Sequence, residues 1–453
     1  MVLPLAACAG DADTASDTSR TEPDTTQTDT EPQTDAGTDE HTETDAQTET
    51  DAQTETDAQT ETDEITEAEP DEKTEPVSNI QTWTFNDGIV GNVIGVYCET
   101  EPYAEVTLRD LTGAVVLREH AIDRYFYGRV ILPSDQPTQT VYIYAKAEGK
   151  GTSAPSRPVT LRFSENVGAN AMIGHNSHVF YNQYRPHYAG QAVIPGADDA
   201  EREAYMSNMK NFLYAQLDAV REATGKNTKI IVVICTNPAT IYHDQQYSEA
   251  EGGWGDHYTE TSTTQFAEYM KDDENVYIID IRKLLEQNKD DKLLFMQADS
   301  HWTQLAAYYA YYMVAQRIQK DFPVTNIYLL EKDFDVEIVP SGGDLLHFMG
   351  VSGVTTAATA SVTWKRDSMR ASNDAPTAYV MGDSYYGAIS MYLDLLFSQV
   401  FLNTPATNPP LYDYSLVDLP TRQPDYLFYV WTERNIDANL AMFASSINAG
   451  NIR

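Results

Sequence analysis

The sequence has few cysteines, few basic residues and no long apolar segment. Its 3 cysteines are too few for a framework of disulfides. No apolar run approaches the roughly 18 residues that a membrane-spanning helix needs. Lysine and arginine number 30 against 69 aspartates and glutamates, which gives a formal net charge of -39. So acidic a chain repels a phosphate backbone, and the composition excludes a nucleic-acid partner.

The remaining composition is that of a chain with folded domains. Aromatic residues make up 11% of the sequence, ample material for hydrophobic cores. A length of 453 residues exceeds one ordinary domain, so two or three domains are expected. Cys98 and Cys235 fall in different predicted domains, and we expect both to be buried thiols.

Residues 9–78 are unusually acidic. They hold 24 aspartates and glutamates against Arg20 and Lys73, and the hexad T-E-T-D-A-Q repeats from residue 42 to residue 63. Such a segment buries too little apolar surface to offset the entropy of ordering. We therefore predict a disordered, self-repelling linker that acts as a stalk, with a plain acidic tail as the alternative.

The extreme N-terminus resembles the end of a bacterial lipoprotein signal. Residues 5–10 read L-A-A-C-A-G, a lipobox in which Cys8 would carry lipid. The apolar stretch before Cys8 is short and lacks a preceding basic residue, so we interpret residues 1–8 as a truncated signal. The alternative is an accidental match. The resemblance implies a bacterial, extracytoplasmic lipoprotein at the cell surface that touches the membrane only through its lipid anchor.

Residues 79–164 show the pattern of a β-sandwich. Short apolar-polar alternations recur every 8–12 residues or so without helical periodicity, as in antiparallel sandwiches. The predicted strands are residues 93–97, 104–108, 115–117, 130–132, 140–144 and 159–161. Their order resembles bacterial immunoglobulin-like (Ig-like) modules. A spacer is the expected role, with weak glycan or partner binding as the alternative.

Residues 165–453 alternate strands with helices. Continuous apolar runs predict buried strands at residues 229–235, 276–280, 293–296, 378–381, 400–402 and 426–431. Helical patterns cover residues 198–224, 281–287, 303–318, 385–397 and 436–447. The alternation predicts an α/β domain with a mostly parallel sheet and helices on both faces. Reactive groups in such sheets gather at the carboxyl ends of strands.

Two motifs lie at predicted strand ends. Gly382-Asp383-Ser384 follows the strand at 378–381, where a serine hydroxyl can project and helix-start amides can stabilise an oxyanion. The alternative is a simple helix N-cap. Asp299 stands two residues before His301, where a carboxylate can orient an imidazole that accepts a proton. A metal-ligand pair or an accidental spacing are the alternatives there.

Together these motifs resemble a known family. D-S-H-W-T-Q-L from Asp299, followed by an Ala/Tyr-rich helix, and G-D-S-Y from Gly382 are similar to the SGNH hydrolase-like domain of alginate O-acetyltransferases (the AlgJ/AlgX group) and of bacterial DHHW proteins. Weaker matches extend from Ile173 to Asn435. The Asp/His block precedes the serine block, as in the permuted arrangement of the acetyltransferase group. The resemblance implies an SGNH-like (flavodoxin-like) fold.

The resemblance also implies a catalytic triad. Ser384 would be the nucleophile, His301 the general base and Asp299 its orienting partner. The Ser384 amide would be one oxyanion donor, and Asn237 or Gly343 would supply a second.

Three further residues are candidates for substrate binding. Trp302 would floor the site, with a core aromatic as the alternative. Tyr385 stands where the family often has phenylalanine. Arg434 would hold an acidic sugar, with a salt bridge to Glu433 as the alternative.

The implied function is an extracytoplasmic O-acetyltransferase that acts on a polysaccharide through an acyl-serine intermediate. No cofactor is expected, and no metal, because no other histidine lies at ligand spacing from His301. A membrane-bound O-acyltransferase would supply the acetyl groups. The alternatives are a carbohydrate acetylesterase with the same triad and a catalytically inactive glycan-binding surface lipoprotein.

Overall fold

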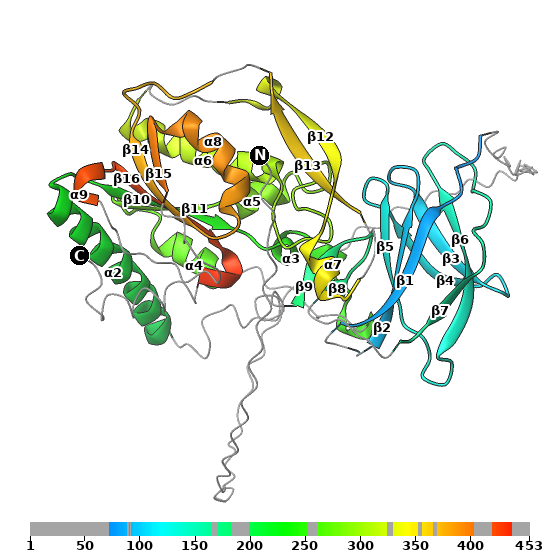
Figure 1. Cartoon of the computed structure of the whole chain (residues 1–453). Helices are drawn as coiled ribbons and strands as arrows, with labels where there is room; N and C mark the ends of the chain where they lie inside the picture. The colour runs from blue at the N-terminus through cyan, green and yellow to red at the C-terminus, as the bar shows by residue number, and fades with distance from the viewer. Residues whose placement is uncertain are drawn as a thin grey trace, which may run out of the picture. The chain divides into compact units, whose positions relative to one another are not determined.

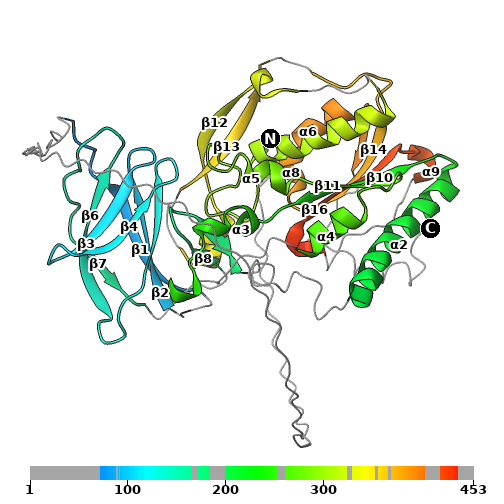
Figure 2. The same cartoon turned by 180° about the vertical axis from the view of Figure 1, so that it is seen from behind.

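The computed structural model describes most of the chain after residue 71. The described residues are 72–87, 90, 92–164, 171–182, 199–251, 261–323, 329–351, 356–365, 369–402 and 419–436 (Figures 1 and 2). Cys8 and the predicted linker up to residue 71 lie outside them, so the signal and the linker stay predictions. So does the predicted helix after Ile436. None of the helices in the described part is long and apolar enough to cross a membrane.

The first folded part contains two antiparallel sheets. Their strand orders are β1-β2-β5 and β4-β3-β6-β7. The strands are β1 Ser78–Asn86, β2 Asn92–Glu99, β3 Glu105–Asp110, β4 Val115–His120, β5 Tyr125–Val130, β6 Thr138–Lys146 and β7 Val159–Arg162. One core that includes Val96, Phe126 and Ile143 joins the two sheets. The Ig-like assignment stays a prediction.

Three details of this part differ from the prediction. Strand β1 was not among the predicted strands. Ordered structure begins before residue 79, because Lys73 bridges Gly151 and the buried Thr74 hydroxyl donates to the Gly151 carbonyl at 3.0 Å. The strand predicted at 130–132 ends at Val130 instead. The strand observed there, β5, begins earlier, at Tyr125, and its first three residues, Tyr125 to Tyr127, are buried aromatic residues.

The second folded part is built on a five-stranded parallel sheet, with strand order β11-β10-β16-β14-β15. The strands are β10 Lys229–Cys235, β11 Val276–Asp280, β14 Thr377–Gly382, β15 Gln399–Leu402 and β16 Tyr426–Thr432. The predicted strands in these five places are confirmed. They are recognisable because strands buried on both faces read as unbroken apolar runs.

Helices cover both faces of this sheet, as predicted (Figure 1). Helices α6 (Gln304–Asp321) and α8 (Tyr386–Leu396) share a core with one face. Helices α2 (Asp199–Thr224) and α4 (Ser262–Tyr269) pack on the other. Shorter helices are α3 Pro238–Ile241, α5 Arg282–Glu286, α7 Asp344–Phe348 and α9 Leu419–Arg422.

The prediction was wrong at residues 293–296, which form no strand of the sheet. Their apolar side chains are packed in a loop whose only pairing is a bridge from Phe295 to Trp302. The prediction also missed an antiparallel hairpin of β12 (Phe334–Ser341) and β13 (Ala357–Trp364). A short pair, β8 (Ala171–Ile173) and β9 (Val179–Tyr181), completes the described strands.

The sandwich and the α/β part share a hydrophobic core. Phe85, Tyr97 and Tyr127 of the sandwich cluster with Ala298 and Leu345 of the α/β part. Both parts fall within one compact unit, residues 69–453. The division into domains at 79–164 and 165–453 stays a prediction. Cys98 and Cys235 are free and buried, as expected.

Candidate active site

Ser384 lies in the turn between β14 and α8. It is exposed, and the N-cap position of α8 belongs to Tyr385, not to Ser384. The side chain that caps the turn is Asp383, whose Oδ1 accepts a hydrogen bond from the Tyr385 backbone amide at 3.0 Å. The N-cap alternative for Ser384 is therefore wrong, and its hydroxyl is left to project from the turn.

Asp383 ties this turn to the neighbouring strand. Its Oδ2 accepts from the amide of Thr432 at 2.6 Å, at the carboxyl end of β16. A Cβ at Gly382 would lie 3.0 Å from the Val430 Cβ, so glycine allows the close approach of the two strands. The serine turn is thus fixed within the parallel sheet.

The candidate base lies on a loop outside that sheet, contrary to the prediction that all three triad residues follow its strands. The loop closes on itself: the Met296 amide donates to the His301 carbonyl at 3.0 Å, and the Thr303 amide donates to the Leu294 carbonyl at 2.9 Å. Ala298 has a φ of 53°, which is rare for residues with a side chain. We call residues 294–303 the histidine loop.

Asp299 orients the His301 imidazole. Nδ1 lies 2.7 Å from Asp299 Oδ1, and because an ionised carboxylate only accepts, Nδ1 carries the proton and Nε2 is free to act as a base. Burial lowers the pKa of His301, but the hydrogen bond and charge of Asp299, helped by the charge of Asp344, outweigh it and raise the pKa above the usual value.

Asp344 is a residue of this site to which the sequence analysis gave no role. It accepts from the Ser300 amide at 2.7 Å and from the Ser300 hydroxyl at 2.6 Å, and its Oδ2 is 3.7 Å from His301 Nδ1. Burial and the neighbouring Asp299 charge raise its pKa. The sequence signal was present in the G-G-D triplet, but only the fold shows that this aspartate meets the histidine loop.

Gly343 packs against the histidine loop, and its oxyanion role stays a prediction. A Cβ there would lie 2.0 Å from the Ala298 carbonyl oxygen, so only glycine fits against the histidine loop. The Asp344 amide then donates to Asp299 Oδ2 at 3.1 Å. The segment at the start of α7 therefore packs against the histidine loop and also hydrogen-bonds to the Asp299 carboxylate.

Trp302 and Tyr385 join the two motifs. Trp302 Nε1 donates to the Tyr385 carbonyl at 2.8 Å, and the Tyr385 hydroxyl donates to the Ser300 carbonyl. Tyr385 is fully buried, so the prediction that it binds substrate does not fit this structure. Trp302 is a core aromatic whose edge also lines the cavity described below, so its substrate role stays a prediction.

Asn237 and Arg434 are not among the described residues that line the cavity presented below. Asn237 is fully buried and neither atom of its side-chain amide has a partner, so the structure leaves its oxyanion role a prediction. The Glu433 carboxylate accepts hydrogen bonds from the backbone amide of Asn237 at 2.9 Å and from the Thr240 hydroxyl at 2.7 Å. The Arg434 guanidinium instead lies 5.4 Å from the centre of the Tyr385 ring.

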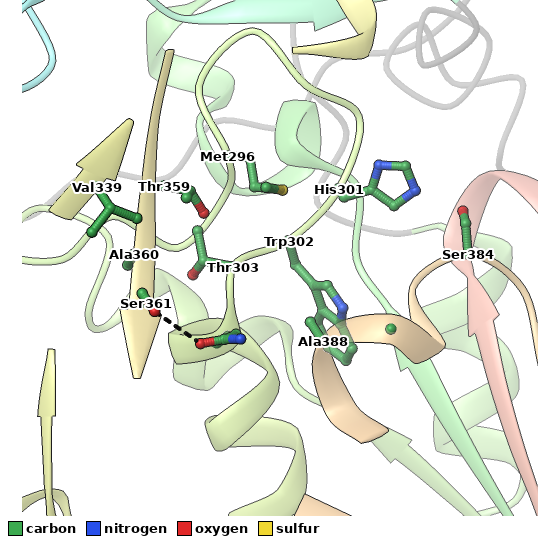
Figure 3. A pocket seen from close by; sticks show the side chains of 12 residues that line it. Met296, His301, Trp302, Thr303, Val339, Thr359, Ala360, Ser361, Ser384 and Ala388 are labelled. Carbon is green, nitrogen blue, oxygen red and sulfur yellow. Dashed lines mark hydrogen bonds between the residues drawn. The ribbon is translucent and has the colours of Figure 1, made fainter. Parts of the chain in front are cut away.

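Ser384 and His301 line the same cavity, of about 310 Å³ (Figure 3). The histidine loop, β13 and the start of α8 form its walls. The described structure contains no hydrogen bond between the Ser384 hydroxyl and the imidazole. The two groups therefore share a cavity without being joined, a common state of catalytic pairs in the absence of substrate.

A metal ion is the competing use of this cluster. Asp299, His301 and Asp344 place ligand atoms within 4.8 Å of one another. The sequence argument against a metal considered only histidine spacing and did not foresee Asp344. However, Nδ1 and the Asp344 oxygens are already engaged in short hydrogen bonds with Asp299 and Ser300, and a metal would have to replace these bonds.

Comparison with known proteins agrees with the motifs. Residues 198–390 match the family described as SGNH hydrolase-like domain, acetyltransferase AlgX. This segment is therefore similar to the SGNH hydrolase-like domain of that family. The matched SGNH-like segment contains Asp299, His301 and Ser384. None of the curated proteins matches the chain.

Several solved structures are similar to this chain. The O-acetyltransferase domain of Pseudomonas putida AlgJ is 17% identical with a TM-score of 0.38, and the match covers 61% of this chain and 99% of that one. Pseudomonas aeruginosa AlgX is 13% identical with a TM-score of 0.40, covering 58% and 61%. A DHHW family protein from Eubacterium siraeum is 12% identical with a TM-score of 0.36, covering 67% and 95%.

Proposed function

We propose that the chain is an extracytoplasmic O-acetyltransferase that moves acetyl groups to hydroxyls of a polysaccharide through an acetyl-Ser384 intermediate. The observation that carries this proposal is that an exposed serine and a carboxylate-backed histidine line one cavity in an AlgX-type acetyltransferase domain. The triad Ser384, His301 and Asp299 is part of the proposal.

The chemistry runs in two matched halves. His301 Nε2 takes the Ser384 proton as the oxygen attacks the acetyl carbonyl of the donor, and the leaving group receives that proton. In the second half Nε2 takes the proton of an acceptor hydroxyl, whose oxygen attacks acetyl-Ser384, and returns it to Ser384. Asp299 keeps Nδ1 protonated and stabilises the imidazolium in both halves.

The oxyanion would form beside the start of α8. The Ser384 amide makes no hydrogen bond in the described structure and is the donor we assign first. A preorganised amide aimed at the position where negative charge develops stabilises the transition state. The proposal requires the Ser384 hydroxyl to come within hydrogen-bonding distance of the His301 imidazole during the reaction.

The setting outside the cytoplasm belongs to the proposal as well. A lipid on Cys8 and the acidic segment 9–78 would tether the catalytic unit near surface glycans. A membrane-bound O-acyltransferase would supply the acetyl groups.

The exposure of Ser384 favours a second candidate, a carbohydrate acetylesterase in which water takes the acetyl group. The two are separated by offering p-nitrophenyl acetate with and without an oligosaccharide mixture. Acetylated sugar supports the transferase, whereas free acetate alone supports the esterase.

Labelling with a fluorophosphonate tests the enzyme proposal itself. We expect the wild type to label on Ser384 and the Ser384→Ala variant not to label. Equal labelling of both would leave only a catalytically inactive surface protein. Unchanged labelling after chelator treatment is expected, because this chemistry uses no metal.

A further inference from the structure

The cavity shared by Ser384 and His301 contains no charged side chain besides the imidazole. Twelve residues of the described structure line it, and none of them is aspartate, glutamate, lysine or arginine. A site that binds an acidic sugar needs a cation to pair the carboxylate, because burying an unpaired charge is costly. The lack of a cation among these lining residues therefore argues for an uncharged sugar over an acidic one as the acceptor.

The lining mixes apolar side chains with polar but neutral ones. Met296, Val339 and Ala388 supply apolar surface, and β13 contributes hydroxyls from Thr359 and Ser361. The Thr359 hydroxyl makes no hydrogen bond with any described residue. Such a cavity, near the lower end of the roughly 300–1,000 Å³ of ligand sites, fits one uncharged sugar ring with its mixed apolar and hydroxyl surface.

Two carboxylates lie close to the imidazole that lines the cavity. Asp299 and Asp344 stand directly behind the imidazole, at 2.7 and 3.7 Å from Nδ1. Both negative charges would repel a substrate carboxylate in the cavity. Arg434 lies over the Tyr385 ring and is not among the described residues that line the cavity, although its positive charge also acts on the His301 imidazole and lowers the pKa of that group.

We propose that the acceptor is an uncharged sugar, a hexose or N-acetylhexosamine unit of a glycan, and that the cavity discriminates against uronic acids. This inference rests on the proposed acetyl transfer. In the transfer the bond between Ser384 Oγ and the acetyl carbon breaks and an ester to the sugar oxygen forms. The sugar proton passes through His301 Nε2 to Ser384, so nothing else is consumed.

The test measures the discharge of acetyl-Ser384. The purified chain is acetylated with p-nitrophenyl acetate and the acetyl-serine is located by mass spectrometry. Acceptors are oligomers of glucose, mannose, galactose and N-acetylglucosamine, and oligogalacturonate with and without methyl esters. We expect at least one uncharged acceptor to discharge the enzyme at least about tenfold faster than free oligogalacturonate does.

Two matched variants sharpen this test. Thr359→Lys places a cation in the cavity and should shift the preference towards free oligogalacturonate. Thr363→Lys makes the same change on the same strand but at an exposed position outside the lining, and should leave the preference unchanged.

The outcomes separate the inference from the proposed function. If acetyl-Ser384 forms but free oligogalacturonate discharges it as fast as every uncharged acceptor, or no acceptor discharges it, the inference is overturned while acylation stands. Loss of uronate transfer on Arg434→Gln would also overturn it. If no acetyl-Ser384 forms, the proposed function itself fails, and the inference with it.

Discussion

The two halves of the candidate site are supported in different ways. The serine turn belongs to the parallel sheet and is fixed by a neighbouring strand through Asp383 and Thr432. The histidine loop lies outside the sheet, and three separate segments hold it. They are the hairpin, the sandwich and the start of α7.

The contacts of Gln297 show this external support most directly. Its side chain donates to the carbonyl of Tyr125 in the sandwich at 3.0 Å and accepts from the amide of Ala358 in the hairpin at 3.2 Å. Asp344 of α7 holds Ser300. The difference teaches that the sheet presents the nucleophile, whereas packing of three peripheral segments presents the base. The sandwich thus contacts the histidine loop, and its role as a spacer stays a prediction.

Removing the Ser384 hydroxyl or the His301 imidazole should have the largest effect on activity. We expect Ser384→Ala and His301→Ala each to lower acetyl-transfer activity about 10³-fold or more, because each half of the site is useless alone. Activity of the double variant, measured with p-nitrophenyl acetate, should be no lower than that of the single variants. Fully additive losses would contradict a shared relay.

Asp299→Asn should weaken the histidine half and change its pH dependence. We expect a loss of roughly 10²- to 10⁴-fold, since the wrong tautomer becomes accessible. The base must be neutral, so wild-type activity should rise with pH through a pKa above the ordinary value of about 6.5. Removing the Asp299 charge lowers the His301 pKa, so the rise should move to lower pH. A rise that stays in place would refute the assignment of Asp299.

Asp344→Asn tests the support of the histidine loop by α7. Losing one charge-assisted bond to Ser300 shifts the imidazole slightly, and we expect kcat to fall roughly tenfold to a hundredfold with little change in KM. Labelling of Ser384 should remain on the same residue. An unchanged kcat and pH profile would show that Asp344 does not position His301.

Gln297→Ala tests the support by the sandwich and should have the smallest effect. It leaves the buried backbone amide of Ala358 without its side-chain acceptor, which costs about 1–3 kcal/mol of unfolding free energy. Denaturant unfolding measures that loss, and kcat should fall severalfold. Gln136→Ala, at an exposed sandwich position away from the loop, should change neither quantity. Equal behaviour of the two variants would exclude a support role.

The serine half was largely predictable from the sequence, because β14 and β10 are continuous apolar runs and G-D-S follows one of them. The histidine half was not. Residues 293–296 read as a strand because a short apolar run has no distinguishing period. The hairpin was missed because β12 contains exposed charged residues such as Asp335 and Glu337 and so has no continuous apolar run.

The contacts that hold the histidine loop were equally hidden. Asp344 and Ser300 meet only through tertiary packing, and no local pattern links them. The same holds for Gln297 and the sandwich carbonyl of Tyr125. The motifs thus identified the reacting groups, whereas their support depends on segments distant in the chain.

The most direct test of the account is a crystal structure of the protein phosphonylated by a fluorophosphonate. We predict the adduct on Ser384, with His301 Nε2 about 2.7–3.2 Å from an oxygen of the adduct or from Ser384 Oγ. An adduct on another residue, or an imidazole that remains beyond hydrogen-bonding distance of a modified Ser384, would contradict the relay.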